Sequence, residues 1–586
     1  LDHQVPLQFR GYRVRAGTAE TSGLRATPIL TSGGAAPVAV AVPDFWQNFP
    51  RAIEGTDTPD GTDGRDARHA GRLVVRFLPR QSADLHELQG GEQKTHVCVI
   101  AAGADPVTAL ALDWCRNPLV AVPDPAWTFA AGAVPWLAPD EPGHAALIGS
   151  AIAGPDTFVH KREVVDEYGW RHFGDIYGDH EAIRHQGPDP LVSHYNNQYD
   201  PVAGFLYQYL RSGDPRWWSM ADELAAHVID IDVYHTTRDK SAYNHGMFWH
   251  TYHYGDADTS THRTYPVASR GITHGGGPSP DHNYTTGLML HYLLTGDEAS
   301  RETVLGLARY VVDVDDGGKT VFRWLSRAPT GLATASGSYA YHGPGRGPAN
   351  AVNALLDGHR LSGDPAFLAK AEALIARVAH PEEPIERLKL DEPEHRWFYL
   401  MFFQSLGKYL WWKAVIGQRD ERYAYARATL LHYARWMADH EYPYLDRPEK
   451  LEFPTETWAA HEARKSDVFA MAAQHAGGDE RARFVERSRF FFRYAVDTLG
   501  GMATRTLARP VIVLLSSGLV LPWLEAHPDA AAPPPERTPA SFGVKPVFVP
   551  QKQIAMRRAK RLAAGAALAG LAAAAALVWS LWVCCG

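Results

Sequence analysis

The stretch DPVAGFLYQYLRSGD, residues 200–214, decides the fold of most of this chain. Its apolar side chains recur at helical intervals, and it ends in Gly213 and Asp214, which are followed by a proline. Glycine ends a helix in the left-handed conformation, and aspartate caps the next helix with proline just inside it. The stretch therefore predicts a helix, a tight turn and the start of a second helix.

The same turn recurs after other apolar helices. The copies are SGDP at 212–215, TGDE at 295–298, SGDP at 362–365, GGDE at 477–480 and a degraded copy, GQRDE, at 417–421. The spacing leaves room for a helical hairpin and a variable loop in each repeat. Repeated hairpins predict an α/α toroid of inner and outer helices, with the loops at one end lining a bowl. We expect residues 159–526 to form it.

The first part of the chain reads differently. PVAVAVPDF (37–45), GRLVVRFLP (71–79) and THVCVIAAG (95–103) are short β-branched and apolar runs between glycine, proline and aspartate. Such runs are typical of an antiparallel sandwich or barrel, so we expect residues 1–150 to be β-rich. The predicted fold class is therefore α+β and multidomain, with an N-terminal antiparallel β-sandwich domain followed by the toroid.

The C-terminal end predicts a membrane anchor. Residues 527–556 form a proline-rich linker that we expect to be extended or disordered. Residues 562–583 contain no charge, and as a helix they would span about 33 Å at roughly 1.5 Å per residue, enough to cross a hydrocarbon core of about 30 Å. We expect a transmembrane helix, with a soluble helix as the alternative.

Basic residues flank this segment on one side only, and they are Arg557, Arg558, Lys560 and Arg561. The positive-inside rule then favours a cytoplasmic body. A cleaved signal would override that orientation. Because the chain opens with Leu1, we expect that a segment precedes it.

The amino-acid composition limits the kinds of partner that we expect for this chain. The net charge of −8 gives no basic footprint for nucleic acid, so we expect no nucleic-acid partner. Four cysteines are too few for a disulfide framework. Seventeen tryptophans and 25 tyrosines fit a protein that handles carbohydrate, although core packing accounts for many of them.

The densest functional run lies between residues 244 and 284. It reads NHGMFWHTYHYGDADTSTHRTYP (244–266) and, after a connector, HGGGPSPDHNY (274–284). Histidine moves protons near neutrality, and tyrosine and tryptophan offer a flat face with a polar tip. The run therefore predicts the lining of a cleft that binds a polar ligand with ring faces, best met by a sugar.

Five segments together resemble the exo-rhamnogalacturonan lyase-like family. They are FWQNFP (45–50), HELQGGEQKTH (86–96), HYNNQYDP (194–201), the 244–284 run and PTETWAAHEARKSDVF (454–469). Members of that family have a RIFT barrel, a central β-sandwich and a C-terminal α/α toroid. The resemblance implies that residues 1–150 match the sandwich, with at most a remnant of the barrel. It also implies a periplasmic or exported location, against the positive-inside rule.

The resemblance further implies β-elimination at a uronic acid of a rhamnogalacturonan-type glycan. That reaction needs donors around the carboxylate, a base near C5 and an acid at the leaving oxygen. Toroidal uronate lyases use an Asn, His, Tyr, Arg order along the chain, which Asn197, His245, Tyr254 and Arg263 follow here. We expect His245 and Tyr254 to move protons, with Arg263 and His250 as further catalytic candidates.

An acidic polysaccharide or oligosaccharide is the expected ligand. The candidate substrate-binding residues are Asn196, Asn197, Trp249, His253, Tyr265, His282, Tyr284, Glu456, Trp458 and Arg464. His282 and Tyr284 precede an apolar helix, whose free amides favour anions, although a plain capped loop is equally consistent. Glu456, Trp458 and Arg464 share a helical face that could grip a sugar or form an ordinary polar network.

Three alternatives remain open. A zinc site could use His245, His250 and His253 with Asp256 and Asp258, but the spacing matches no strong motif, so we expect no cofactor; a carboxylate-held divalent cation stays open. A glycoside hydrolase on the same scaffold would need two opposed carboxylates, with Asp200, Asp256, Asp281 and Glu456 as candidates. A membrane-anchored protein that binds glycan without turning it over is the third.

Overall fold

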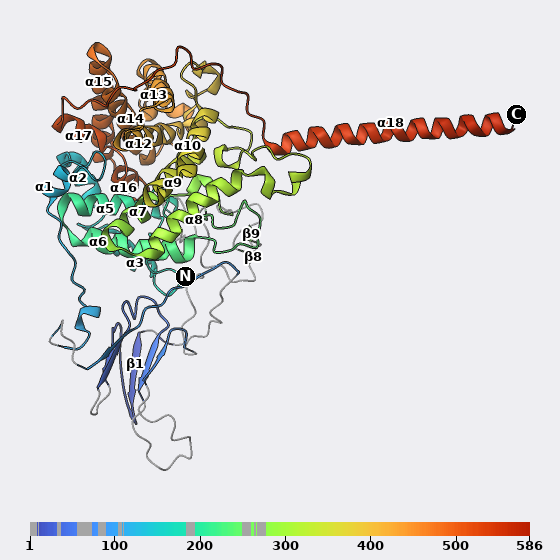
Figure 1. Cartoon of the computed structure of the whole chain (residues 1–586). Helices are drawn as coiled ribbons and strands as arrows, with labels where there is room; N and C mark the ends of the chain where they lie inside the picture. The colour runs from blue at the N-terminus through green and yellow to red at the C-terminus, as the bar shows by residue number, and fades with distance from the viewer. Residues whose placement is uncertain are drawn as a thin grey trace.

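The computed structural model describes residues 9, 11–31, 37–55, 73–79, 90–103, 108, 110–182, 194–248, 260–262, 265–266 and 277–585, with backbone only at 181–182, 260–262, 265–266 and 585. The chain is a mixed α+β protein. Small sheets lie at one end of a large helical body, and a long C-terminal helix projects from that body (Figure 1).

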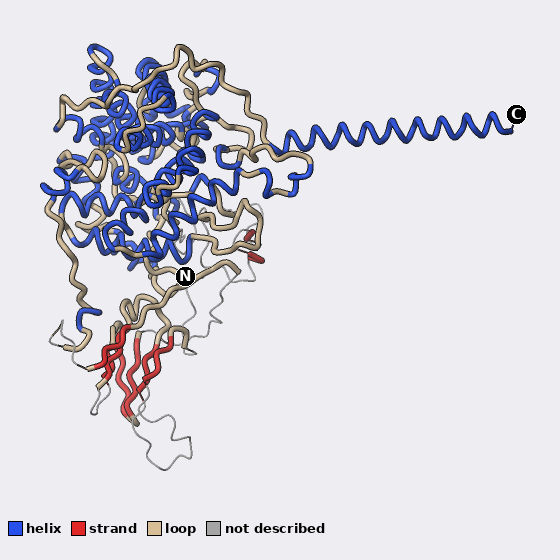
Figure 2. Tube along the Cα trace, in the orientation of Figure 1, coloured by secondary structure: helices blue, strands red, loops and turns tan. Residues whose placement is uncertain are grey.

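The N-terminal strands form small antiparallel sheets, drawn in red in Figure 2. The strands are β1 (Tyr12–Ala16), β2 (Ala19–Gly23), β3 (Ile29–Thr31), β4 (Val38–Ala41), β5 (Ala52–Gly55), β6 (Leu73–Arg76) and β7 (Val99–Ala102). The largest sheet has the order β3-β4-β7, and its central strand buries Ala39 and Ala41 against Leu112 and Cys115. The antiparallel β-structure predicted for this part of the chain is confirmed at this level.

The remaining elements are mostly helices. They are α1 (Pro125–Ala131), α2 (Pro142–Gly149), α3 (Phe158–Val165), α4 (Asp179–Ala182), α5 (Pro201–Ser212), α6 (Pro215–His227), β8 (Ser260–His262), β9 (Tyr265–Pro266), α7 (Thr286–Thr295), α8 (Glu298–Asp315), α9 (Arg346–Ser362), α10 (Pro365–Val378), α11 (Pro393–Arg396), α12 (Tyr399–Val415), α13 (Glu421–His440), α14 (Glu456–His475), α15 (Gly478–Gly500), α16 (Ala508–Leu515), α17 (Val520–Ala526) and α18 (Gln551–Cys585). Helices thus begin at Pro125, inside the range that we expected to be β-rich.

Six helices of the body contact one another in a cyclic order. α5 packs on α7, α7 on α9, α9 on α12, α12 on α14, α14 on α16, and α16 returns to α5. α6, α8, α10, α13 and α15 each follow one of these helices and pack against it. The apolar faces of this inner series form one continuous core cluster.

The predicted turns hold at four of the five copies. Gly213, Gly296 and Gly363 end their helices with φ of 70°, 73° and 70°. The aspartates that follow accept hydrogen bonds from the first amides of the next helices, and so does Asp420 in the degraded copy. The copy at 477–480 differs, because Gly477 is the N-cap there and Asp479 lies inside the first turn of α15.

Residues 527–550 of the proline-rich segment form no helix or strand, and they contact the body at several points. The amide of Ala532 donates to the carbonyl of Gln474, Tyr423 Oη donates to the carbonyl of Pro533, and Lys545 pairs with Glu383 at 2.7 Å. The segment therefore contacts α14, α13 and the loop after α10 before it reaches α18.

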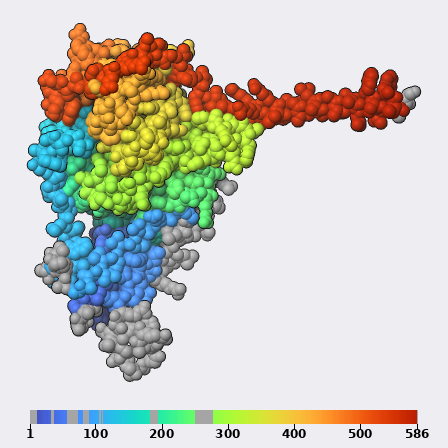
Figure 3. Space-filling model, in the orientation of Figure 1, coloured from blue at the N-terminus to red at the C-terminus, as the bar shows by residue number. Residues whose placement is uncertain are grey.

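The part of α18 from Gln551 to Cys584 is long and apolar enough to span a membrane. The body buries none of the apolar window within it. It stands clear of the body in the space-filling view (Figure 3). A second apolar stretch, Ala508–Ala526, also passes the length and composition test, but 67% of it is buried, as expected for core helices.

Candidate functional site

The N-terminal ends of the inner helices meet at one end of the body. The residues found there are Tyr199 before α5, His282 and Tyr284 before α7, Arg346 at the start of α9, Trp397 before α12, and His461 and Arg464 in α14. The tight Gly-Asp turns lie at the other ends of these helices. The amide dipoles of several helices therefore point toward this group, which favours negative charge in it.

Tyr199 lies in an unusual backbone segment. Asn196, Asn197, Tyr199 and Asp200 have φ of 50°, 52°, 64° and 60°, although none of them is glycine. Asp200 stabilises the segment by accepting from the amides of Ala203, at 3.2 Å, and Gly287, at 3.1 Å. Left-handed conformations of such residues cost roughly 1–3 kcal/mol each and concentrate at functional sites.

Arg346 connects two of the gathered side chains. Its Nη2 donates to Tyr199 Oη over 3.0 Å, and its Nη1 donates to His282 Nε2 over 3.0 Å. The guanidinium carbon also lies 5.4 Å from the centre of the Trp397 ring. Because arginine only donates, His282 Nε2 accepts, and neutral His282 must carry its proton on Nδ1.

Arg464 approaches the same tyrosine from α14. Its guanidinium carbon lies 4.9 Å from the Tyr199 ring centre, and its Nη1 donates to Gln404 Oε1 over 2.9 Å. Its Nε donates to His461 Nδ1 over 3.3 Å. His461 stacks on Trp397 with ring centres 4.0 Å apart and planes at 18°.

The site carries positive charge without a paired carboxylate. Within the described parts of the chain, no Asp or Glu oxygen lies within 4.0 Å of the guanidinium of Arg346 or Arg464, and Arg464 is only 4% exposed. Burial, with the nearby guanidiniums of Arg464 and Arg346, lowers the pKa of His461 well below its usual value. His461 is therefore neutral, and since its Nδ1 accepts from Arg464, its Nε2 carries the proton.

Two further tyrosines complete the lining. Burial raises the pKa of Tyr195 well above its usual value, and its hydroxyl has no hydrogen-bond partner among the residues described. Burial raises the pKa of Tyr284 to about 12. A cavity of about 80 Å³ extends from Tyr199, Tyr284 and Arg464 along the axis of the inner helices. Its farther wall includes Lys408 and Asp467.

The structure brings together three of the predicted substrate-binding residues: His282, Tyr284 and Arg464. Asn196 and Asn197, three and two residues before Tyr199, are fully buried, and within the described chain Asn197 Nδ2 has no hydrogen-bond partner.

Two other candidates on α14 lie behind the site. Trp458 packs its ring edge-on against His461 at 6.0 Å and donates to the carbonyl of Phe453. Glu456 accepts a hydrogen bond from Thr504 Oγ1 at 2.9 Å. Lys465, from the same helical face, pairs with Glu441 and Glu462 at 2.8 and 2.9 Å. Part of that face is thus an ordinary polar network, and only Arg464 and His461 reach the site.

His245 lies in a turn at a different place. Its φ is 61°, and its amide donates to the carbonyl of Tyr234. Burial, with a smaller effect of the His245 imidazole, lowers the pKa of His235. The other predictions from this run fall outside the described residues: Trp249, His250, His253, Tyr254, Asp256, Asp258, Arg263 and the side chain of Tyr265.

The carboxylates considered for hydrolysis differ in their surroundings. Asp200 is the N-cap of α5, and Glu456 accepts a hydrogen bond from Thr504. Asp281 lies near Arg346, and burial raises its pKa to about 6.

The sequence patterns did not indicate Tyr199, Arg346 or Trp397 as site residues. Tyr199 stands inside the HYNNQYDP segment, so its neighbours were found but not the residue itself. Arg346 and Trp397 carry no local motif, because their importance comes only from the helix ends that meet around them.

Comparison of this chain with protein-family models gives no match, and none of the curated proteins matches it.

Proposed function

We propose that this chain is a polysaccharide lyase that cleaves a uronate-containing glycan, of rhamnogalacturonan type, by β-elimination. The observation that carries the proposal is the pair of arginines, Arg346 and Arg464, on either side of Tyr199 without a carboxylate partner among the described residues. A buried guanidinium is costly unless an anion accompanies it. The carboxylate of a uronate would supply that anion.

In this proposal the inner helices form an α/α toroid, and the site occupies its mouth. The cyclic order of helix contacts supports it. The helix N-termini and the arginines favour an anionic sugar over a neutral one. The stacked pair of Trp397 and His461 offers an apolar face for a sugar ring.

Each residue then has a distinct task. Arg346 and Arg464 bind the uronate carboxylate and draw charge from C5, which makes the C5 proton easier to remove. Tyr199 acts as a phenolate. Its Oη takes the C5 proton and becomes a neutral phenol, which gives that proton to the leaving oxygen on the same face of the sugar as the C4–O bond breaks and the C4=C5 double bond forms. The hydrogen bond from Arg346 stabilises the Tyr199 phenolate before it takes the C5 proton and again after it has given the proton up. The Nε2–H of His461 donates to the sugar.

The test is a screen of the full-length protein against acidic polysaccharides, rhamnogalacturonan first. A lyase produces the absorbance band of an unsaturated uronate and a product lighter by one water than the hydrolysis product. Reducing ends without that band would refute the proposal and favour the hydrolase. Binding without any turnover would favour the non-catalytic glycan-binding protein.

The hydrolase stays the second candidate because of Asp281. With a pKa of about 6, its carboxyl group is partly protonated near neutrality and could act as an acid beside Arg346. The same screen decides between the two reactions, since Asp281→Asn would abolish hydrolysis but leave an elimination carried by Tyr199.

A further inference from the structure

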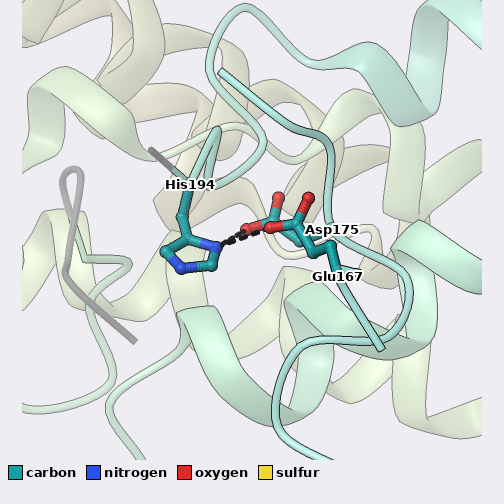
Figure 4. A group of neighbouring side chains, drawn as sticks. All are labelled: Glu167, Asp175 and His194. Atoms are coloured by element: carbon teal, nitrogen blue, oxygen red, sulfur yellow. Dashed lines mark ion pairs between the residues drawn. The ribbon is translucent and has the colours of Figure 1, made fainter. Parts of the chain in front are cut away.

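A second cluster of ionisable side chains is buried away from the mouth of the inner helices. Glu167, Asp175 and His194 each offer one ligand atom, and these atoms lie within 4.8 Å of one another (Figure 4). His194 Nδ1 lies 2.8 Å from Glu167 Oε1 and 3.2 Å from Asp175 Oδ2. Glu167 and Asp175 are fully buried, and His194 is 2% exposed.

The surroundings add one carboxylate and one imidazole. His227 Nε2, at the end of α6, lies 3.7 Å from Asp175 Oδ2 and 3.7 Å from Asp232 Oδ1. Three buried carboxylates therefore meet two imidazoles.

The side chain of Glu167 gives the evidence that this cluster binds a cation. Its Oε2 is buried, and within the part of the chain that the structure describes it has no hydrogen-bond partner. Figure 4 shows its carboxylate aimed at His194 beside that of Asp175. A buried carboxylate oxygen normally accepts hydrogen bonds or binds a cation.

The local backbone is built to bring these groups together. Gly174 has φ of 105°, and a Cβ there would lie 2.3 Å from the carbonyl oxygen of Glu223 and 2.9 Å from the Cβ of His227. Only glycine allows this approach, which presses Asp175 against α6. His194 follows Asp175 by 19 residues in the chain, and its ring stacks on that of His172, with centres 5.4 Å apart.

We propose that Glu167, Asp175 and His194 bind a divalent transition-metal ion of the zinc class. The mixed nitrogen and oxygen donors favour such an ion over calcium or magnesium, which prefer oxygen alone. Zinc bonds of roughly 2.0–2.2 Å place neighbouring ligand atoms about 3.4 Å apart in a tetrahedral site. The two separations from His194 Nδ1 need only a small adjustment to meet that value. His227 holds the Asp175 carboxylate from the side.

The role of the ion is structural. It joins the segment between α3 and α4 to His194, which opens the segment that leads to Tyr199. Metal content and stability report on the ion directly. The metal site can therefore be confirmed or refuted without any measurement of the proposed lyase activity.

The first experiment uses the full-length protein purified in detergent. Mass spectrometry of the metal content is expected to give about one zinc per chain after incubation with zinc sulfate and gel filtration. A chelator should lower the melting temperature by about 5 °C, and zinc but not magnesium should restore it. Cobalt in place of zinc should give the visible bands of a low-symmetry cobalt site.

Two variants and one control decide the outcome. Glu167→Gln keeps the shape of the side chain, and His194→Gln removes the nitrogen ligand; both should lose zinc and the zinc-dependent rise in melting temperature. His291→Gln is the control, because His291 also binds an aspartate, Asp222, at 2.9 Å, but outside the cluster. Zinc content that is equal in wild type, Glu167→Gln and His291→Gln would overturn the site. So would a folded wild type that takes up no zinc, because a proton-held network then explains the cluster.

Discussion

Arg346 Nη2 donates to Tyr199 Oη over 3.0 Å, although the two residues are 147 positions apart in the chain. The hydrogen bond joins the first residue of α9 to the segment before α5, across the mouth of the inner helices. It forms only when the helices between them have packed in their cyclic order. The relationship therefore links the completion of the fold to the assembly of the site.

Arg346 is predicted to be essential for turnover. Arg346→Ala should lower kcat/KM by about 10²–10³-fold, since it removes a preorganised donor at a developing charge. Arg346→Lys should recover little of this loss, because lysine cannot bond Tyr199 and His282 in the same geometry. Steady-state kinetics on the glycan that the screen identifies provide the measurement.

The matched control for Arg346 is on the same helix. Arg360, near the other end of α9, stacks on Trp411 and Trp412 at 5.2 and 5.4 Å. Arg360→Lys should leave kcat/KM within about threefold of wild type, as expected for a change at a distance from the chemistry. Equal losses in the two lysine variants would mean that Arg346 acts through stability alone.

Tyr199→Phe removes one oxygen and keeps the ring. We expect kcat to fall by about 10²–10⁴-fold, the usual contribution of a positioned acid or base, while oligosaccharide affinity changes little. Titration calorimetry with product and stopped assays with substrate separate the two effects. Tyr425→Phe is the control, because the Tyr425 hydroxyl donates to the carbonyl of Ala379 between outer helices. A Tyr199→Phe enzyme with normal kcat would remove Tyr199 from the mechanism.

The sequence predicted the hairpins well because each turn is fixed by local chemistry. Gly213 and Asp214 determine their turn through a left-handed φ and a side-chain cap, and neither needs a distant partner. The copy at 477–480 has Gly477 where the copies at 212–215, 295–298 and 362–365 have Ser or Thr, and there Gly477 itself is the N-cap of α15.

The site was predictable only in part. His282 and Arg464 stood in segments already rich in functional side chains, whereas Arg346 follows a glycine-rich loop that carries no motif. Its role depends on which helix ends meet in space, and periodicity does not contain that information. The buried cluster of Glu167, Asp175 and His194 was missed for the same reason, because its ligands come from separate segments.

His475 is predicted to make the fold sensitive to acid. It is 8% exposed, and burial together with Arg427 lowers its pKa to about 3. The unfolded chain binds a proton at His475 near pH 6.5, so stability is lost as the pH falls from about 6.5 toward 3. The loss is about 1.4 kcal/mol per pH unit for this group.

His475→Gln removes this loss of stability at low pH. Urea unfolding at pH 7.5, 6.0 and 5.0 should show the variant gaining stability relative to wild type as the pH falls. A constant difference between wild type and His475→Gln would show that His475 is protonated in the folded state.

Gly287 is predicted to be indispensable for the contact between α5 and α7. A Cβ at this position would lie 2.4 Å from the amide nitrogen of Ala203 and 2.5 Å from Asp200 Oδ1. Gly287→Ala should therefore cost about 3 kcal/mol of unfolding free energy through overpacking.

Gly296 provides the comparison within the same hairpin. Its φ is 73°, but a Cβ there meets nothing within 4 Å. Gly296→Ala should cost about 1 kcal/mol, the strain of a left-handed alanine alone. Similar melting temperatures for the two alanine variants would contradict the close approach of the helices.

The base of α18 is held by the body. Gln551 Nε2 donates to the carbonyls of Gly317 and Ser326, each at 2.6 Å, and Arg558 donates to the carbonyl of Leu325 at 2.7 Å. These hydrogen bonds fix the direction in which α18 leaves the body. Where α18 crosses a bilayer, this fixed direction sets the orientation of the helical body relative to the membrane surface, and so decides which of its faces points away from the lipid.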